Sequence, residues 1–162
     1  MEVSAGTVIV FFTTEGIYRL SLVSNGPLSL YAGKQQEAPW PGLRRDLERF
    51  FNGKGKDIAW KYPILMQGYS SWTRKVLEAA GEIPFGRTWS YRQLAEKTES
   101  PRAARAVGQA LGRNRTPILI PCHRVIGSGG TPGGFGAGLE WKKELLKLEG
   151  IEIIEKNSRE NF

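Results

Sequence analysis

The chain has few of the residues and segments that are typical of several common protein classes. Its 162 residues include one cysteine and one histidine. A single thiol excludes an intramolecular disulfide, and a structural zinc site would need four ligands where this chain offers two such side chains. The longest apolar run near the N-terminus, residues 7–12, is too short to span a membrane, and no basic segment precedes it. We therefore expect no membrane segment, no secretory signal and no metal, and a reducing compartment, the cytoplasm.

Positive charge is what the sequence has in excess. The net charge is +7 and the pI is about 9.7. Seven of the basic side chains lie between Arg87 and Arg115, where only Glu96 and Glu99 oppose them. A local concentration of this kind favours a nucleic acid as partner over charge that serves solubility alone.

The first 65 residues predict a small α+β domain. Residues 7–14 and 16–24 are rich in β-branched and aromatic side chains and are separated by a turn. A second turn at Asn25-Gly26-Pro27 predicts a third strand over 28–31. Apolar residues then recur at helical spacing from Leu43 to Phe51, and 57–62 predicts one more strand. Residues 1–65 are thus expected to form a short antiparallel sheet with one helix.

Residues 66–162 predict a mainly helical second domain. An apolar stripe from Trp72 to Ala80 ends at Gly81, and Ser90 is placed to cap a helix over 91–97. Ser100 followed by Pro101 predicts the start of another helix at Arg102, which would put Arg102 and Arg105 on one face. The two helices make a helix-turn-helix candidate whose small residues suit close approach to DNA, although a tightly packed helix with a charged edge would show the same pattern. A glycine-rich loop over 127–138 and a last helix ending at Gly150 complete the domain.

Cys122 and His123, the only residues of their types, are neighbours. A thiolate is a good nucleophile for carbon, and imidazole can accept the thiol proton directly or through water. Residues 118–120 predict a buried strand that Pro121 interrupts just before the thiol, an arrangement that presents a nucleophile. An inert buried thiol beside a core histidine remains the alternative. The imidazole needs an orienting carboxylate, for which Glu140, Glu144, Glu149 and Glu152 are equal candidates.

The segment Ile120-Pro121-Cys122-His123-Arg124-Val125 resembles the active-site sequence of the O6-alkylguanine-DNA alkyltransferases, also called methylated-DNA–protein-cysteine methyltransferases. The resemblance continues from about residue 72 to residue 150. It includes 90–95, 103–108, Asn114, 133–135 and 145–150. The first 65 residues are assigned to the family's variable N-terminal domain by position only.

The resemblance implies a role for each matching residue. Cys122 would accept the alkyl group, His123 would take its proton, and Glu149 would orient His123. Tyr91 would donate a hydrogen bond to the flipped guanine, Asn114 would brace the turn near the thiol, and Arg105 would fill the space that the base leaves. The remaining DNA-binding candidates are Arg102, Ala104, Gln93, Ser90 and Arg124. The candidates for lining the base pocket are Leu111, Val125, Phe135, Gly136 and Ala137.

Together these features predict a fold and an activity. The fold would be α+β, with the mainly helical C-terminal domain carrying a winged helix-turn-helix. The activity would be an irreversible, stoichiometric transfer of the alkyl group from O6-alkylguanine in double-stranded DNA to Cys122, with O4-alkylthymine as an additional candidate substrate. The resemblance implies a monomer that needs no cofactor and that works in the cytoplasm, at the nucleoid or in a nucleus.

Two positions depart from the family pattern. Phe135 stands where tyrosine is common, which removes a phenolic hydroxyl, and Arg115 follows Asn114 where proline is usual. We expect Arg115 to loosen the turn and to add a charge that reaches a phosphate. Three other classes remain open: a non-catalytic relative that binds alkylated DNA, which would lack the cysteine; a helix-turn-helix regulator, which would not need it; and a cysteine hydrolase, which would turn over many times.

Overall fold

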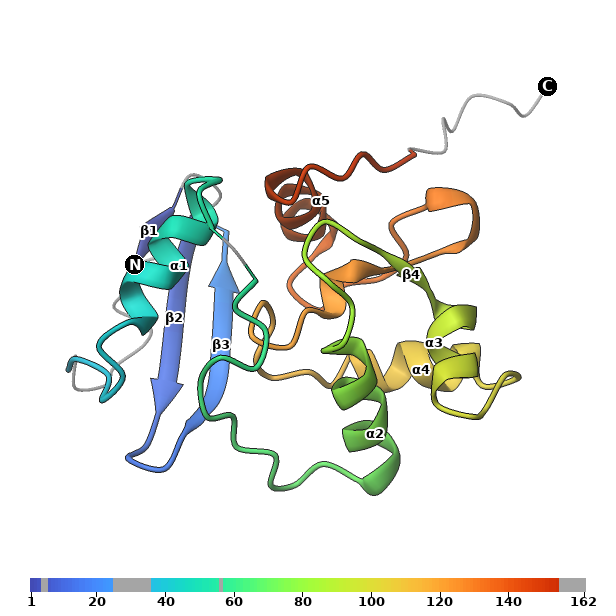
Figure 1. Cartoon of the computed structure of the whole chain (residues 1–162), viewed down its shortest axis with the longest axis horizontal. Coiled ribbons are helices and arrows are strands. Elements are labelled where there is room, and N and C mark those ends of the chain that lie inside the picture. The colour runs from blue at the N-terminus through green and yellow to red at the C-terminus, as the bar shows by residue number, and fades with distance from the viewer. Residues whose placement is uncertain (4–5, 25–35, 56, 155–162) are drawn as a thin grey trace.

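The N-terminal part of the chain forms a small antiparallel sheet covered by one helix. The computed structural model describes residues 1–3, 6–24, 36–55 and 57–154. Strands β1 (Glu2–Val3), β2 (Gly6–Phe12) and β3 (Ile17–Val23) lie in the order β1-β2-β3. Figure 1 shows α1 (Leu43–Phe51) against the sheet. The strands predicted at 7–14 and 16–24 and the helix are confirmed, β1 was not predicted, and the strand expected at 28–31 lies outside the described residues.

The segment 57–62 contradicts its prediction as a strand. Residues 59–62 form turns and bends, and Trp60 adopts a left-handed backbone conformation with φ of 55°. The carboxylate of Asp57 accepts a hydrogen bond from the backbone N–H of Ala59, which stabilises the turn locally. The β-propensity of Ile58 and Tyr62 reflects burial against the neighbouring elements, since both belong to the apolar core, whereas Trp60 is exposed.

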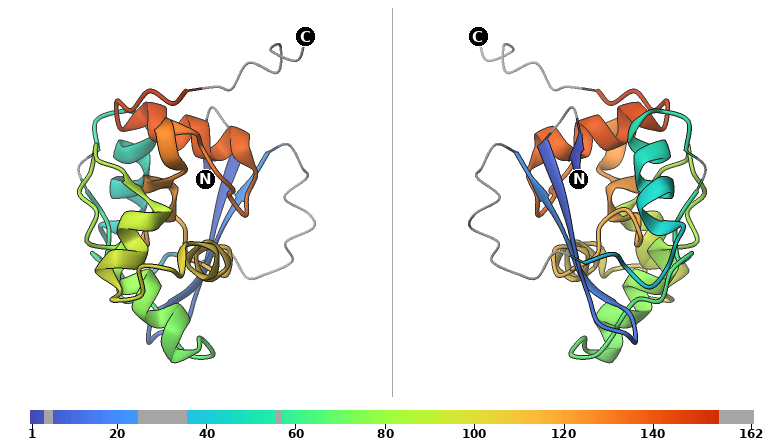
Figure 2. Two further views of the ribbon diagram at one scale, coloured as in Figure 1. Left: turned by 90° about the vertical axis from the view of Figure 1, so that its right-hand side faces the viewer. Right: turned by 90° about the vertical axis from the view of Figure 1, so that its left-hand side faces the viewer.

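Among its described residues, the C-terminal part contains four α-helices, α2 (Ser71–Ala80), α3 (Tyr91–Lys97), α4 (Ala104–Leu111) and α5 (Leu139–Leu148). Strand β4 (Trp89–Ser90) pairs in parallel with β5 (Val125–Ile126). The predicted cap of α3 is confirmed, because the Ser90 hydroxyl accepts from the N–H of Gln93 and the Gln93 side chain accepts from the N–H of Ser90. Figure 2 shows α5 across one end of the sheet. The α+β class is confirmed, whereas the wing and the boundary at residue 65 stay predictions.

Helix α4 begins two residues later than the sequence suggests. Its N-cap is Ala103, and no side chain caps it. Ser100 and Pro101 instead form a turn, in which the carbonyl of Ser100 accepts from the N–H of Ala103 and the Ser100 hydroxyl donates to Thr98. Arg102 therefore lies in this turn rather than on the helix, and Arg105 is the second residue of α4.

Two apolar clusters meet at the segment that leads to Cys122. The first combines the sheet and α1 with Ile118, Leu119 and parts of α5. The second combines α2, α3 and α4 with Ile120 and Cys122. Residues 118–120 are buried as predicted, but they form a turn with Ile118 at φ of 74° rather than a strand. A turn lets successive side chains enter different clusters, so the segment is anchored on both sides. None of the described helices has the length and apolarity needed to cross a membrane.

Candidate active site

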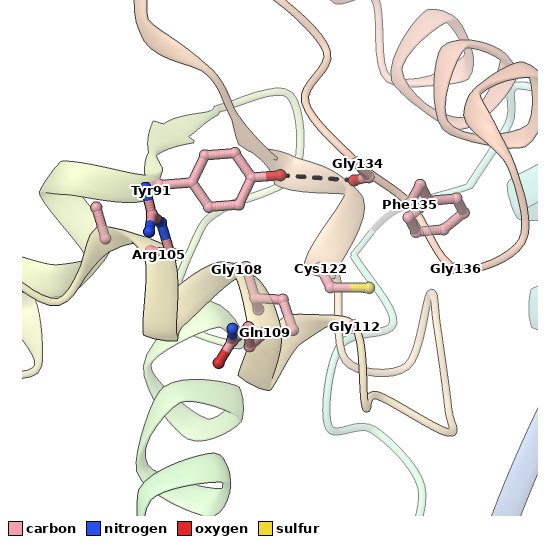
Figure 3. A pocket seen from close by; sticks show the side chains of 11 residues that line it. Tyr91, Arg105, Gly108, Gln109, Gly112, Cys122, Gly134, Phe135 and Gly136 are labelled. Atoms are coloured by element: carbon pink, nitrogen blue, oxygen red, sulfur yellow. Dashed lines mark hydrogen bonds between the residues drawn. The ribbon is translucent and has the colours of Figure 1, made fainter.

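A cavity of about 570 Å³ opens between α3, α4 and the glycine-rich loop, with Cys122 among its walls. Figure 3 shows Tyr91 and Arg105 on one side of the thiol and Phe135 on the other. The lining residues are Tyr91, Ala104, Arg105, Gly108, Gln109, Leu111, Gly112, Cys122, Gly134, Phe135 and Gly136. Glycine and alanine backbones along α4 leave room for a flat ligand, and the volume is sufficient for a nucleobase with a small substituent.

Cys122 is the first residue of a short 3₁₀ helix, Cys122–Arg124, and is 7% exposed. Burial raises the pKa of the thiol, whereas a hydrogen bond from Asn114 acts to lower it. Asn114 Nδ2 lies 3.1 Å from Cys122 Sγ and 2.9 Å from the Ile120 carbonyl oxygen. The cysteine is therefore a protonated thiol at neutral pH that becomes a nucleophile when a base removes its proton.

A base of the right kind is adjacent in the sequence and fully buried. His123 Nε2 lies 2.7 Å from Glu149 Oε1, and both side chains have 0% exposure. Burial lowers the pKa of His123, so the imidazole is neutral near pH 7. With Nε2 donating to the carboxylate, the lone pair is on Nδ1, which has no hydrogen-bond partner among the described residues. The structure thus selects Glu149 from the four carboxylates that the sequence left open.

Glu149 is held as a carboxylate by several donors. Burial acts to raise its pKa, but the hydrogen bonds from His123 and Arg124 outweigh this and lower it. Arg124 Nε lies 2.9 Å from Glu149 Oε2, and the backbone N–H of Gly86 donates to the same oxygen at 2.9 Å. The carboxylate therefore cannot rotate away from the imidazole without breaking other hydrogen bonds.

Arg124 corrects a prediction, because it does not face DNA. Its side chain is 1% exposed and connects Glu149 with Asp57, whose carboxylate accepts from both terminal guanidinium nitrogens. It also donates to the backbone carbonyl of Ile83 at 2.8 Å. A buried guanidinium with this many partners links the site to the N-terminal part of the chain. The local sequence does not show this burial, because the partners Glu149 and Asp57 lie 25 and 67 residues away in the chain.

Lys142 is a site residue that the sequence reasoning missed. It is fully buried, and its Nζ donates to the carbonyls of Val125 at 2.6 Å and Gly134 at 3.1 Å. Burial lowers its pKa to about 8. It fastens the glycine-rich loop to the strand that follows the 3₁₀ helix. The only signal was a lysine within the apolar spacing of α5, next to Trp141.

Tyr91 packs against the same loop from the cavity side. Its hydroxyl donates to the Gly134 carbonyl oxygen at 3.5 Å, a long hydrogen bond that a ligand could replace. Burial raises the pKa of Tyr91, which keeps the phenol protonated as a donor. Gly133 has φ of 68°, and a Cβ there would lie 2.5 Å from the Tyr91 hydroxyl. This glycine is therefore required for the loop to approach the tyrosine closely.

The remaining predicted residues divide between the cavity, the surface and the core. Arg105 and Ala104 line the cavity, and Arg102 is exposed beside them. Ser90 and Gln93 are engaged in the α3 cap. Of the predicted pocket residues, Leu111, Phe135 and Gly136 line the cavity, whereas Val125 is buried in β5 and Ala137 borders a second cavity. Gly108, Gln109, Gly112 and Gly134 line the first cavity without having been predicted.

The second cavity, of about 430 Å³, reaches Cys122 from the side of β3. It shares Leu111, Gly112, Phe135 and Gly136 with the first, and its own walls include Arg19, Arg113 and Pro117. The thiol therefore lies where two hollows meet. No group of three or more His, Cys, Asp or Glu side chains is placed to hold a metal ion among the residues that the structure describes.

The fold and site together define a protein with a cysteine thiol on the wall of a helix-lined cavity and a buried His–Glu pair behind it. Comparison with known families gives the particular assignment. Residues 71–151 match the family described as the 6-O-methylguanine DNA methyltransferase, DNA binding domain. This range is half of the chain, and the chain belongs to this family.

Individual relatives agree with the family. The methylated-DNA–protein-cysteine methyltransferase of Haemophilus influenzae is 40% identical over 126 residues, which cover 77% of this chain and 69% of the relative. The protein of the same name from Methanopyrus kandleri is 45% identical over 108 residues, covering 67% and 79%. A crystal structure of the Mycobacterium tuberculosis O6-methylguanine methyltransferase matches with a TM-score of 0.77 and 30% identity over 92% of this chain and 89% of that one. A structure of the M. tuberculosis protein in complex with DNA matches with a TM-score of 0.75 and 29% identity over the same shares.

Proposed function

We propose that this chain repairs double-stranded DNA by moving the alkyl group of O6-alkylguanine irreversibly to Cys122. The observation that carries the proposal is the placement of the thiol on the wall of a base-sized cavity, directly next to the buried His123–Glu149 pair. Family membership supplies the substrate class. O4-alkylthymine is a second substrate of the same kind, because it presents an alkyl group on an exocyclic oxygen of a flat base.

The reaction forms one bond and breaks one. His123 Nδ1 accepts the thiol proton, directly or through a water, and Glu149 stabilises the resulting imidazolium. The sulfur lone pair attacks the alkyl carbon, the bond from that carbon to O6 breaks, and its electron pair remains on the guanine. A hydrogen bond from Tyr91 stabilises the departing guanine anion, which becomes neutral by taking up a proton, so that the net reaction moves the thiol proton from His123 to the base. The product is a thioether that no group in the site can cleave, so each chain reacts once.

Access to the alkyl group requires the nucleotide to leave the duplex. A stacked base is unreachable, and its extrusion costs a few kcal/mol. Arg105, exposed at the start of α4 and on the cavity wall, is placed to occupy the vacated position in the stack, while the small residues around it permit close approach to a minor groove. Arg102 is placed for a phosphate contact. The protein acts as a monomer in the cytoplasm, at the nucleoid or in a nucleus.

The test is a measurement of intact protein mass after incubation with a duplex that contains O6-methylguanine. The expected gain is one methyl group in place of one hydrogen, located on the peptide that contains Cys122, with no reaction beyond one equivalent. Cys122→Ser is the matched control: it should lose transfer completely and retain binding to the duplex. Several turnovers per chain would indicate a hydrolase instead, and binding without any mass gain would indicate a non-catalytic DNA-binding protein.

A further inference from the structure

Arg115 is not the mobile surface charge that its sequence position suggests. Its guanidinium carbon lies 4.1 Å from the centre of the Tyr69 ring, in stacking range. Its Nη2 donates to the carbonyl oxygens of Gln67 at 2.6 Å and Leu65 at 3.4 Å. The expectation that Arg115 reaches a phosphate is therefore wrong, because its side chain is bound to the segment that leads into α2.

The backbone of Arg115 is fixed as firmly as its side chain. Its N–H donates to the Tyr69 hydroxyl oxygen at 2.8 Å. Its carbonyl accepts from the N–H of Leu20 in β3 at 2.8 Å. Tyr69 thus contacts this residue twice, with its ring against the guanidinium and its hydroxyl against the amide. We call Tyr69 and Arg115 together the Tyr69–Arg115 clamp.

The clamp acts on the residue that touches the nucleophile. Asn114 immediately precedes Arg115, and its Nδ2 lies 3.1 Å from Cys122 Sγ. The orientation of the amide is determined by its other partners: the Ile120 carbonyl can only accept, at 2.9 Å, and the Thr116 N–H can only donate, at 3.0 Å. An N–H directed at sulfur stabilises the thiolate more than the thiol. Any rotation of the 114–116 turn would move this donor away from Sγ.

We propose that Tyr69 and Arg115 are positioning residues that hold Asn114 in donor contact with the Cys122 sulfur. The stacked guanidinium and the tyrosine hydroxyl fix the 114–116 turn through non-covalent contacts. The role in alkyl transfer rests on the proposed function, whereas the effect on the thiol does not.

The experiment measures the reactivity of Cys122 with iodoacetamide as a function of pH, without DNA. Cys122 is the only cysteine, so the reaction reports on one site. Tyr69→Phe removes one oxygen and keeps the ring, and we expect it to move the pH midpoint upward by roughly half a unit, about a threefold loss of thiolate at a fixed lower pH. Arg115→Gln should move it in the same direction. Midpoints that stay at the wild-type value in both variants would overturn the proposal.

Two matched controls separate this effect from general loosening. Arg74 also donates to a carbonyl of the same segment, Met66 at 3.1 Å, but within the described part of the chain it makes no hydrogen bond or ion pair with the 114–116 turn, so Arg74→Gln should leave the midpoint unchanged. Tyr18→Phe removes an exposed hydroxyl and should also leave it unchanged. A shift in either control equal to that of the clamp variants would mean that the midpoint reports stability rather than position.

A double-mutant cycle assigns the effect to Asn114. If the clamp acts through the amide, Tyr69→Phe should cause no further shift in an Asn114→Ala background. Additive shifts would overturn the assignment. The outcome is independent of repair: a wild-type protein that fails to gain a methyl group would refute the proposed function while the thiol titration still tested the clamp. A normal mass gain with an unmoved midpoint would refute the clamp alone.

Discussion

The two sides of Cys122 differ in almost every physical respect. Toward α4 the walls are glycine, alanine and exposed arginine, and the hollow is open to a large flat ligand. Behind the thiol, His123, Arg124, Lys142 and Glu149 are all at most 6% exposed, and Glu149 is joined to His123 and Arg124 by short hydrogen bonds. The open side is built for recognition of a partner that must enter and leave. The buried side holds the His123 imidazole in one tautomer and one orientation.

This difference determines how each kind of residue should respond to mutation. A residue on the open side acts only when DNA is present, so its effect should depend on the substrate and on salt. A residue in the buried network acts on the thiol itself, so its effect should be the same for any substrate. The predictions below follow this division, from the largest expected effect to the smallest.

The largest effect after loss of the thiol should come from the proton acceptor and its partner. We expect His123→Ala and Glu149→Gln each to slow single-turnover transfer by about 10²- to 10⁴-fold, because general base catalysis contributes that range. The double variant should be little slower than either single variant, since the two act as a unit. Glu144→Gln, in the same helix but outside the network, is the control. Fully additive losses would mean that the two residues have separate roles.

Arg124 should matter more for folding than its partner Asp57. Arg124→Lys loses the planar arrangement that serves Glu149 and Asp57 together, and we expect a cost of roughly 3 kcal/mol in the free energy of unfolding. Asp57→Asn should cost about 1 kcal/mol, because the Asp57 side chain is 40% exposed. In that variant the Arg124 guanidinium keeps its hydrogen bonds to Glu149 and to the Ile83 carbonyl. Urea titration measures both. A larger loss for Asp57→Asn would show that the link to the N-terminal part dominates.

Arg102→Ala should weaken binding to any duplex and leave the chemistry unchanged. If the side chain contacts one phosphate, the slope of log K against log salt should fall by about 0.9. Lys54→Ala removes the same charge just after α1, a helix that Figure 1 shows on the opposite side of the view from α3 and α4, and should leave the slope unchanged. An equal change in both variants would attribute the effect to net charge instead.

Acid should destabilise the buried side first. Burial lowers the pKa of His123 below its ordinary 6.5, so the unfolded chain binds a proton that the folded chain refuses, and stability falls as pH drops below about 6.5. The lowered pKa of Glu149 adds a second loss below about 4.5. His123→Gln should reduce the first loss. Urea midpoints at pH 7 and 5.5 measure this, and an identical fall in the variant would assign the loss elsewhere.

The sequence predicted some elements of the fold better than others, for physical reasons. Helix periodicity and capping residues identified α1, α2, α3 and α5, since these signals are local. Ser100 and Pro101 predicted a helix start two residues too early, because the turn that they form is stabilised by hydrogen bonds that helix periodicity does not reveal. Ile58, Tyr62 and residues 118–120 are buried in turns or bends, and β-propensity cannot distinguish such residues from residues in strands.

The site was predicted from the sequence only in part. Cys122 and His123 stood out by rarity, but Glu149 could be chosen only through the family resemblance, because local sequence does not show which carboxylate folds against an imidazole. Arg124 and Lys142 were misjudged or missed because charge predicts exposure on average, and their burial depends on partners distant in the chain. The same holds for Arg115, whose partner Tyr69 lies 46 residues away.

The most direct test compares one residue from each side on two substrates. Single-turnover rates of Arg105→Ala and Glu149→Gln are measured with the alkylated duplex and with the free modified base, which needs no extrusion. We predict that Arg105→Ala slows the duplex reaction by at least about tenfold more than the free-base reaction, a difference of roughly 1.4 kcal/mol. Glu149→Gln should slow both equally. Equal slowing of both substrates by Arg105→Ala would contradict the division between recognition and chemistry on which the account rests.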